Sequence, residues 1–172
     1  EIQDFINENV LKSFQPSSET ISVKNENRIS EPKTITEYYN PMPEDENNHH
    51  VVLSWLLGES HNPVELLESY LVSNILLDNS ASPLRKTLEN TDLGKSLSPL
   101  TGLEADHKEL VFAAGLEGVD SNKQLEVEEL ILNCLKNVVS NGISKELVQS
   151  SLHQLEIKQR EITGSGLSLI HI

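Results

Sequence analysis

The sequence has little of what builds a disulfide scaffold, an aromatic core or a membrane span. Of its 172 residues one is a cysteine, Cys134, so no disulfide can form within the chain, and a reducing compartment is compatible with this count. Aromatic residues make up only 4%, which leaves the core to aliphatic side chains and favours a helix-rich fold. No apolar run reaches the roughly 20 residues that a membrane-spanning helix needs.

Positive charge is also scarce. Lys and Arg number 13 against 27 Asp and Glu, for a net charge of −14. Nucleic acids and anionic membranes are bound through basic surfaces, so we expect neither as a partner. The negative charge is not confined to a tail, because residues 1–48 hold 10 acidic and 4 basic residues (net −6) and residues 49–172 hold 17 and 9 (net −8).

The length predicts one domain, residues 1–172. We divide it into a helix over 1–14, a polar connecting segment over 15–48 and a main body over 49–172. The first residues, Glu-Ile-Gln-Asp, contain no Met and no signal-peptide pattern, and the last residues are still apolar. We therefore expect the sequence to be a fragment of a longer protein.

The first 48 residues carry one helical pattern and one weak strand pattern. Apolar residues at helical spacing predict a helix over 4–14, which Pro16 ends. The segment that follows is rich in Ser, Asn, Glu and Pro. Within it, residues 34–39 read as a short strand bounded by Pro32 and Pro41.

The main body opens with HHVVLSWLL, residues 49–57, which predicts a buried strand too apolar for an exposed edge. We expect Trp55 in contact with helices. Asn62 then fits a helix N-cap, Pro63 the first helical position and Glu65 the position that closes a capping box. This helix is expected to run to about residue 78.

The remaining patterns alternate between strands and helices. Ser82-Pro83 predicts a short helix over 84–90, residues 93–118 predict a hairpin whose clearer strand is 109–116, and two helices follow over 121–142 and 144–164. The last helix has an apolar stripe at Val148, Leu152, Leu155 and Ile162. The expected fold class is α+β, with a mainly antiparallel sheet and helices packed on one face.

His153-Gln-Leu-Glu156 is the pattern closest to a catalytic motif. The inverted zinc motif H-x-x-E-H needs a second histidine where this sequence has Ile157, and one histidine cannot begin that site. A polar helix face is the favoured interpretation. His49 and His50 resemble a ligand pair, but adjacent residues of a strand point to opposite faces and cannot hold one metal together.

Other candidates are weaker still. The turn over residues 104–107 contains Glu, Asp and His without a second cluster, and a solvated turn is the simpler interpretation. Cys134 lies among apolar helix residues, where a free thiol acts as a small hydrophobe. Ser80 and Ser82 lie in a turn without a Gly-x-Ser-x-Gly elbow, and the glycines form no phosphate loop. We therefore predict no catalytic, cofactor-binding or metal-binding residue in this chain.

Several stretches together resemble the pitrilysin/insulinase family of zinc metallopeptidases, in its presequence-protease branch. They are HHVVLSWLLGES (49–60), LLDNSASPLRKTLENTDLG (76–94), SPLTGLE (98–104), ELVFAAGLEGVDS (109–121) and the helix HQLEIKQREI (153–162). The resemblance covers roughly residues 30–164.

The resemblance implies a clamshell enzyme whose two halves, each of two similar α+β domains, enclose a chamber that degrades unstructured peptides. Its zinc motif belongs to the first domain, and this sequence is similar to the second domain of the N-terminal half. It therefore implies zinc in the parent protein, none in this chain, and the other parent domains and unstructured peptides as partners. An acidic chamber wall would favour basic peptides.

Three functions remain open at this point. The chain is a noncatalytic domain of an active zinc endopeptidase, a scaffold in a family member that lacks zinc, or a free-standing peptide-binding domain that uses a sheet edge. An H-x-x-E-H motif upstream in the parent would favour the first, and its absence the second. The expectation that the sequence is a fragment counts against the third. The cytoplasm or an organelle matrix is the favoured location.

Overall fold

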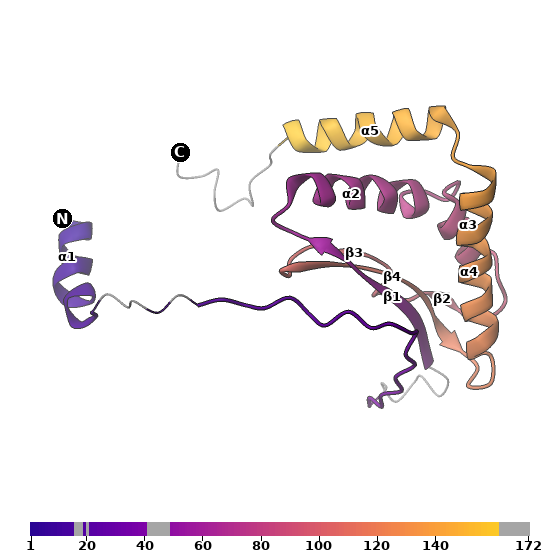
Figure 1. Ribbon diagram of the computed structural model, residues 1–172, viewed down its shortest axis with the longest axis horizontal. Coiled ribbons are helices and arrows are strands. Elements are labelled where there is room, and N and C mark those ends of the chain that lie inside the picture. The colour runs from indigo at the N-terminus through magenta and orange to yellow at the C-terminus, as the bar shows by residue number, and fades with distance from the viewer. Residues whose placement is uncertain (16–18, 20, 41–48, 162–172) are drawn as a thin grey trace.

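A computed structural model of the chain shows an antiparallel sheet with helices stacked on one side and an isolated N-terminal helix (Figure 1). It describes residues 1–15, 19, 21–40 and 49–161. The sheet and the helices confirm the α+β class. Among the described residues, no helix is long and apolar enough to cross a membrane.

The sheet has two long strands and two short ones. The long pair runs antiparallel, and both short strands pair with its second member, in the order β1-β4-β2 with β3 also on β4. The predicted hairpin is the β3–β4 pair. The strands are β1 (His49–Glu59), β2 (Ser96–Leu97), β3 (Gly102–Glu104) and β4 (Glu109–Val119).

The placement of β1 corrects one expectation. The strand predicted to be too apolar for an edge is the edge strand of this order, and none of its residues is fully buried. One side of it packs as predicted: Trp55 lies against the core, with its ring 6.0 Å from that of Phe112. The other side is more open, with Leu56 36% exposed. β1 is thus an apolar edge strand that packs one face on the core and leaves the other face partly exposed.

A β-bulge lies at each end of the β1–β4 ladder. Near the start of β1 the register shifts by one residue on β4, where Gly118 takes a φ of +67° that glycine adopts readily. Near the end of β1 the extra residue is on β1 itself, between Leu56 and Glu59. This second bulge positions the polar network described below.

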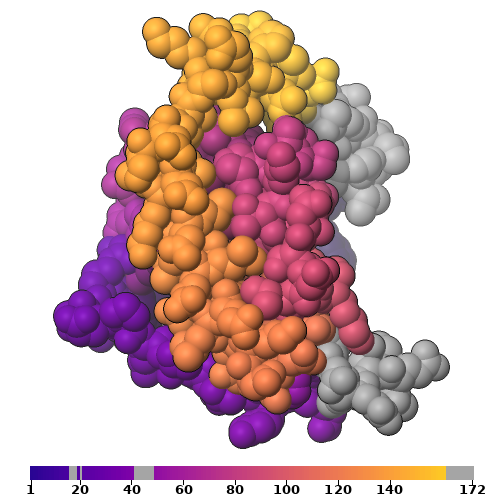
Figure 2. All heavy atoms as spheres, turned by 90° about the vertical axis from the view of Figure 1, so that its right-hand side faces the viewer, coloured from indigo at the N-terminus to yellow at the C-terminus, as the bar shows by residue number. Residues whose placement is uncertain are grey.

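Four helices lie on one side of the sheet: α2 and α3 come between β1 and β2 in the chain, and α4 and α5 follow β4. α3 and α4 pack together, α2 lies over the sheet, and α5 packs on α2 at the outside of the stack (Figure 1). Seen from the α4 side, α4 and α3 lie side by side with α5 above them (Figure 2). The helices are α2 (Pro63–Leu77), α3 (Pro83–Glu89), α4 (Gln124–Asn141) and α5 (Lys145–Arg160).

The start of α2 follows the predicted capping in part. The Asn62 side chain accepts a hydrogen bond from the Val64 N–H at 3.1 Å, and Pro63 is the first helical residue. Glu65, however, does not close a capping box on Asn62: its carboxylate accepts from the Glu59 N–H at 2.8 Å. The Glu65 side chain therefore binds the end of β1 and not the start of its own helix, because Gly58 has no Cβ to exclude the carboxylate.

One apolar cluster holds the sheet and the helices together. Aliphatic side chains dominate it, as the shortage of aromatic residues requires. Its buried members are Leu76, Leu84, Leu88, Phe112, Ala114, Leu116, Val119, Val127, Ile131 and Cys134.

The segment before β1 differs from the sequence expectation in two respects. The helix predicted over 4–14 is two pieces, α1 (Ile2–Asn9) and the 3₁₀ turn η1 (Leu11–Ser13), because Val10 leaves helical geometry with φ −124°. Residues 34–39 form no strand. All of them are exposed, so pairing them with a neighbouring strand would gain no stabilisation from burial. The expected end of the last helix at 164 and its stripe residue Ile162 lie outside the described residues.

Candidate functional site

The structure separates the histidines considered as metal ligands. On α5, His153 Nδ1 is 4.0 Å from Glu156 Oε2, and both side chains are more than half exposed. Glu156 also forms an ion pair with Arg160 at 2.5 Å. This is a polar, solvent-facing helix surface that lacks a third ligand. Within the described part of the chain, no group of three or more His, Cys, Asp or Glu could hold a metal ion.

His49 and His50 lie on different sides of β1. His49 is exposed, whereas His50 is half-buried, with Nδ1 3.5 Å from Ser98 Oγ and Nε2 4.0 Å from Glu117 Oε2. The rings of Tyr39 and His50 are in edge-to-face contact, with their centroids 5.6 Å apart. His50 thus joins the beginning of the sheet to the polar segment that precedes it.

Most of the remaining candidates have structural partners. In the 104–107 turn the Glu104 carboxylate accepts from the Asp106 N–H at 3.0 Å. Cys134 is buried, with Sγ 3.3 Å from Thr87 Oγ1. Ser82 is buried at the start of α3, where its hydroxyl accepts from the Asn79 N–H at 3.3 Å, and Ser80 is exposed. None of them faces a base or a second ligand.

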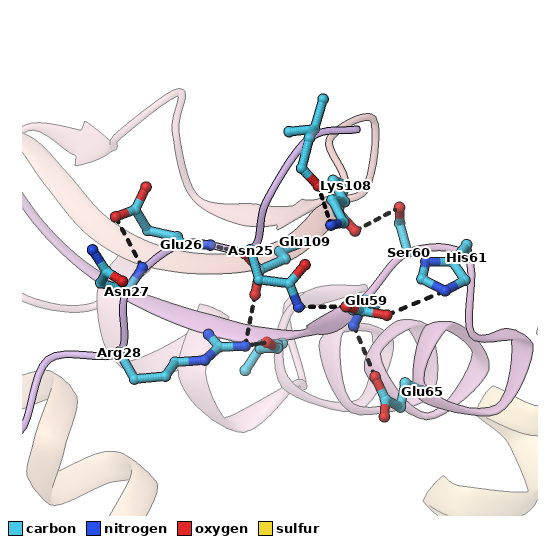
Figure 3. A network of polar contacts seen from close by, with 12 residues as sticks. Asn25, Glu26, Asn27, Arg28, Glu59, Ser60, His61, Glu65, Lys108 and Glu109 are labelled. Carbon is cyan, nitrogen blue, oxygen red and sulfur yellow. Dashed lines mark hydrogen bonds and ion pairs between the residues drawn. The ribbon is translucent and has the colours of Figure 1, made fainter. Parts of the chain in front are cut away.

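A network of polar and charged side chains lies at the other end of the sheet (Figure 3). It joins the extended segment before β1 to the bulged end of the β1–β4 ladder. We call it the clasp and define it by Asn25, Glu26, Arg28, Glu59, Lys108 and Glu109.

Two carboxylates opposite each other form the base of the clasp. Glu59 at the end of β1 and Glu109 at the start of β4 are register partners. Like charges directly opposite on neighbouring strands destabilise a sheet. This pair therefore requires compensating donors, and the extended segment supplies most of them.

Glu109 receives two of these donors. The Arg28 guanidinium donates to one carboxylate oxygen at 2.8 Å, and the Glu26 backbone N–H donates to the other at 2.6 Å. Glu109 is only 7% exposed, whereas Arg28 is 51% exposed. The same Arg28 nitrogen donates to the Leu57 carbonyl at 2.7 Å, in the bulge. A carboxylate buried in this way needs its partners to offset its lost hydration.

Glu59 has a different set of partners. Its carboxylate accepts a hydrogen bond from the Asn25 amide and lies 3.1 Å from His61 Nε2. The Asn25 hydrogen bond, with smaller contributions from the charges of His61, Lys108 and Arg28, holds the pKa of Glu59 below its ordinary value. Glu59 therefore favours its charged form in the clasp.

Lys108 completes the attachment from the β3–β4 turn. Its ammonium donates to the Val23 carbonyl, and its own carbonyl accepts from the Ser60 N–H at 2.9 Å. In the clasp, backbone and side-chain groups of the segment form hydrogen bonds with residues at the end of β1 and at or just before the start of β4. With the Tyr39–His50 contact at the opposite end, the segment is attached at both ends of β1.

The chemistry of the clasp is that of attachment. It contains no nucleophile paired with a base, and its carboxylates are occupied by donors from the same chain. Sequence reasoning missed all of it, since Arg28 and Glu109 are 81 residues apart and neither belongs to a motif. The one available signal was a charged residue, Glu109, at the first position of a mostly apolar strand.

Comparison of the sequence with known protein families identifies the family of this chain. Residues 1–155 match the family described as the peptidase M16 inactive domain. The match includes α1, the clasp, the sheet and most of the helical layer.

Several curated relatives are presequence proteases. The mitochondrial presequence proteases of Yarrowia lipolytica and Emericella nidulans are 33% and 36% identical over 127 and 118 residues, which is 72% and 68% of this chain. Presequence protease 1 of Arabidopsis thaliana, chloroplastic/mitochondrial, is 34% identical over 165 residues, 90% of this chain. The chain spans only 12%, 11% and 15% of the lengths of these relatives.

Proposed function

This chain belongs to the M16 peptidase family, in its presequence-protease branch, and from that premise we propose that it forms part of the wall of a peptide-degrading chamber. It is a noncatalytic domain of a peptidase. The proposed parent is a zinc metalloendopeptidase that acts on short unstructured peptides, with this chain as the second domain of its N-terminal half. The match of residues 1–155 to the inactive domain carries the proposal.

The residues that the structure describes do not fit a zinc site. His153 has one carboxylate neighbour and Ile157 where a second ligand would stand, and the described residues offer no group of three metal-binding side chains. A zinc peptidase needs a metal-bound water and a base, so we assign that chemistry to other domains of the parent. What this chain contributes is a rigid sheet, a helical layer and a fixed connection through the clasp.

The charge of the chain supports one class of substrate. A net charge of −14 creates a negative potential that attracts basic peptides more than acidic ones. The curated relatives are named presequence proteases. We therefore propose basic, unfolded targeting peptides as the substrates of the parent.

The test is a peptidase assay on the full-length parent and on this chain alone. We expect the parent to cleave an unstructured basic peptide, to spare a folded protein and to lose activity with a metal chelator. This chain alone should cleave neither. A parent without an H-x-x-E-H motif and without activity would overturn the enzymatic proposal in favour of a scaffold. Chelator-sensitive cleavage by this chain alone would contradict its noncatalytic role.

A further inference from the structure

The N-terminal helix presents an apolar face that the rest of the described chain leaves uncovered. α1 contacts η1 and stands apart from the sheet and the helical layer (Figure 1). Two of the chain's three phenylalanines lie here, and both are 67% exposed. The exposed apolar residues are Ile2, Phe5, Ile6, Val10, Leu11 and Phe14.

Such a helix is unstable by itself in water. Isolated helices shorter than about 12–15 residues are marginal even with favourable sequences, and α1 has 8 residues. Helices this short are stabilised by packing of their apolar side, and clustered exposed apolar residues mark interaction surfaces. Ile2, Phe5 and Ile6 share one side of α1, with Asp4 and Asn7 on the other.

We propose that α1 and η1 dock through this face onto an apolar surface of another domain of the same parent polypeptide. The inference rests on the proposed function, because it requires a parent with further domains. Relatives of which this chain spans 11–15% have ample chain to supply that surface. The family match begins at residue 1, so α1 belongs to the matched domain and is not an unrelated extension.

The clasp limits where that surface can lie. Lys108 fixes the Val23 carbonyl to the corner of the sheet. From Phe14 to Val23 a fully extended chain covers about 30 Å at most. The part of the docking surface that meets Phe14 therefore lies within about that distance of the Val23 carbonyl, on a domain adjacent to this corner. The clasp and the apolar face then act together, one holding the segment to this domain and the other to its neighbour.

The test compares two substitutions that add the same charge to opposite sides of α1. Phe5→Asp places a carboxylate on the apolar face, and Asn7→Asp, its control, places one on the polar face. Each is made in this chain and in the full-length parent, and amide hydrogen exchange is measured over residues 2–9. Unchanged Trp55 fluorescence shows that the main body still folds.

In the parent we expect residues 2–9 to be protected, with Phe5→Asp raising their exchange at least tenfold and Asn7→Asp leaving it unchanged. In this chain alone we expect the same residues to exchange without protection, and the chain to sediment as a monomer. Unchanged protection in the Phe5→Asp parent would overturn the proposal. So would a dimer of this chain that Phe5→Asp dissociates, or protection in the isolated monomer, which would identify a second copy or the chain's own body as the occupant. Exchange does not depend on peptidase activity, so an inactive parent leaves this result interpretable.

Discussion

Arg28 and Glu109, which are 81 positions apart in the sequence, form an ion pair with a nitrogen–oxygen distance of 2.8 Å. The same guanidinium also donates a hydrogen bond to the Leu57 carbonyl at 2.7 Å. One guanidinium thus neutralises a buried carboxylate and satisfies the backbone of a β-bulge. This double role explains why an otherwise exposed polar segment has a defined position on the sheet.

Arg28→Met should loosen this attachment. The substitution leaves the Glu109 carboxylate with the Glu26 N–H alone, and we expect a loss of about 1–3 kcal/mol in the free energy of unfolding. Urea unfolding followed by Trp55 fluorescence measures the loss, and limited proteolysis of residues 21–33 should accelerate. Lys33→Met removes a positive charge from the exposed part of the same segment and is the control. Equal stability of the two variants would contradict the role of Arg28.

Glu59 should titrate below its ordinary pKa of 4.5. Because the pKa is lowered in the folded state, the stabilisation from this carboxylate is complete above its ordinary value and is lost as the pH falls through the lowered one. Asn25→Ala removes the main cause and should raise the pKa toward 4.5, as NMR titration of the Glu59 carboxyl would show. Asn27→Ala, a neighbouring amide, should not. Titration of wild-type Glu59 at or above 4.5 would refute the prediction.

Gly58 and Glu65 should be energetically coupled. A Cβ at position 58 would lie 1.9 Å from Glu65 Oε2, so Gly58→Ala must displace the carboxylate from the Glu59 N–H. We expect a cost of about 1–2 kcal/mol for this hydrogen bond. In a double-mutant cycle with Glu65→Ala, the second substitution should add much less than it does alone. Strict additivity would show that the contact contributes nothing.

Gly115→Ala should be far more damaging. Its Cβ would lie 2.2 Å from the Val51 carbonyl oxygen and 2.8 Å from the Val52 Cα, both backbone atoms of β1 that cannot move without breaking the ladder. Gly142→Ala is a useful comparison, because the added Cβ meets no atom within 4 Å and only the backbone conformation, φ +73° and ψ 179°, opposes it, at a cost of about 1–3 kcal/mol. We expect soluble, folded Gly142→Ala and unfolded or insoluble Gly115→Ala, judged by circular dichroism. The reverse order would mean that β1 is not paired as described.

Trp55 should report on the β1 face that packs against the core. It is the only tryptophan and is partly buried against Phe112. We expect native emission between the buried and the water-exposed limits, moving red on unfolding. Trp55→Ala should cost about 2–3 kcal/mol, less than the 3–5 kcal/mol of a fully buried aromatic ring. A fully water-like native emission would place this side of β1 in solvent.

Local signals in the sequence were sufficient for most elements of the main body. Asn62 and Pro63 predicted the start of α2, and the apolar run at 109 predicted β4, because capping and strand propensity depend on near neighbours. The family resemblance was confirmed as well. These features require no knowledge of which elements meet in space.

Pairing across the chain was decided only by the tertiary structure. Residues 34–39 have a strand pattern but are exposed and form no strand. β1 lies at an edge despite its apolar sequence, and the Glu65 carboxylate accepts a hydrogen bond from the Glu59 N–H and not from the start of its own helix. No sequence motif predicted the clasp, because it forms only when the pairing of β1 and β4 places the carboxylates of Glu59 and Glu109 opposite each other. The sequence by itself determined where most helices and strands of the main body lie, since those depend on local contacts. The edge position, the bulge and the clasp depend on contacts between residues far apart in the chain, and only the folded molecule decides those.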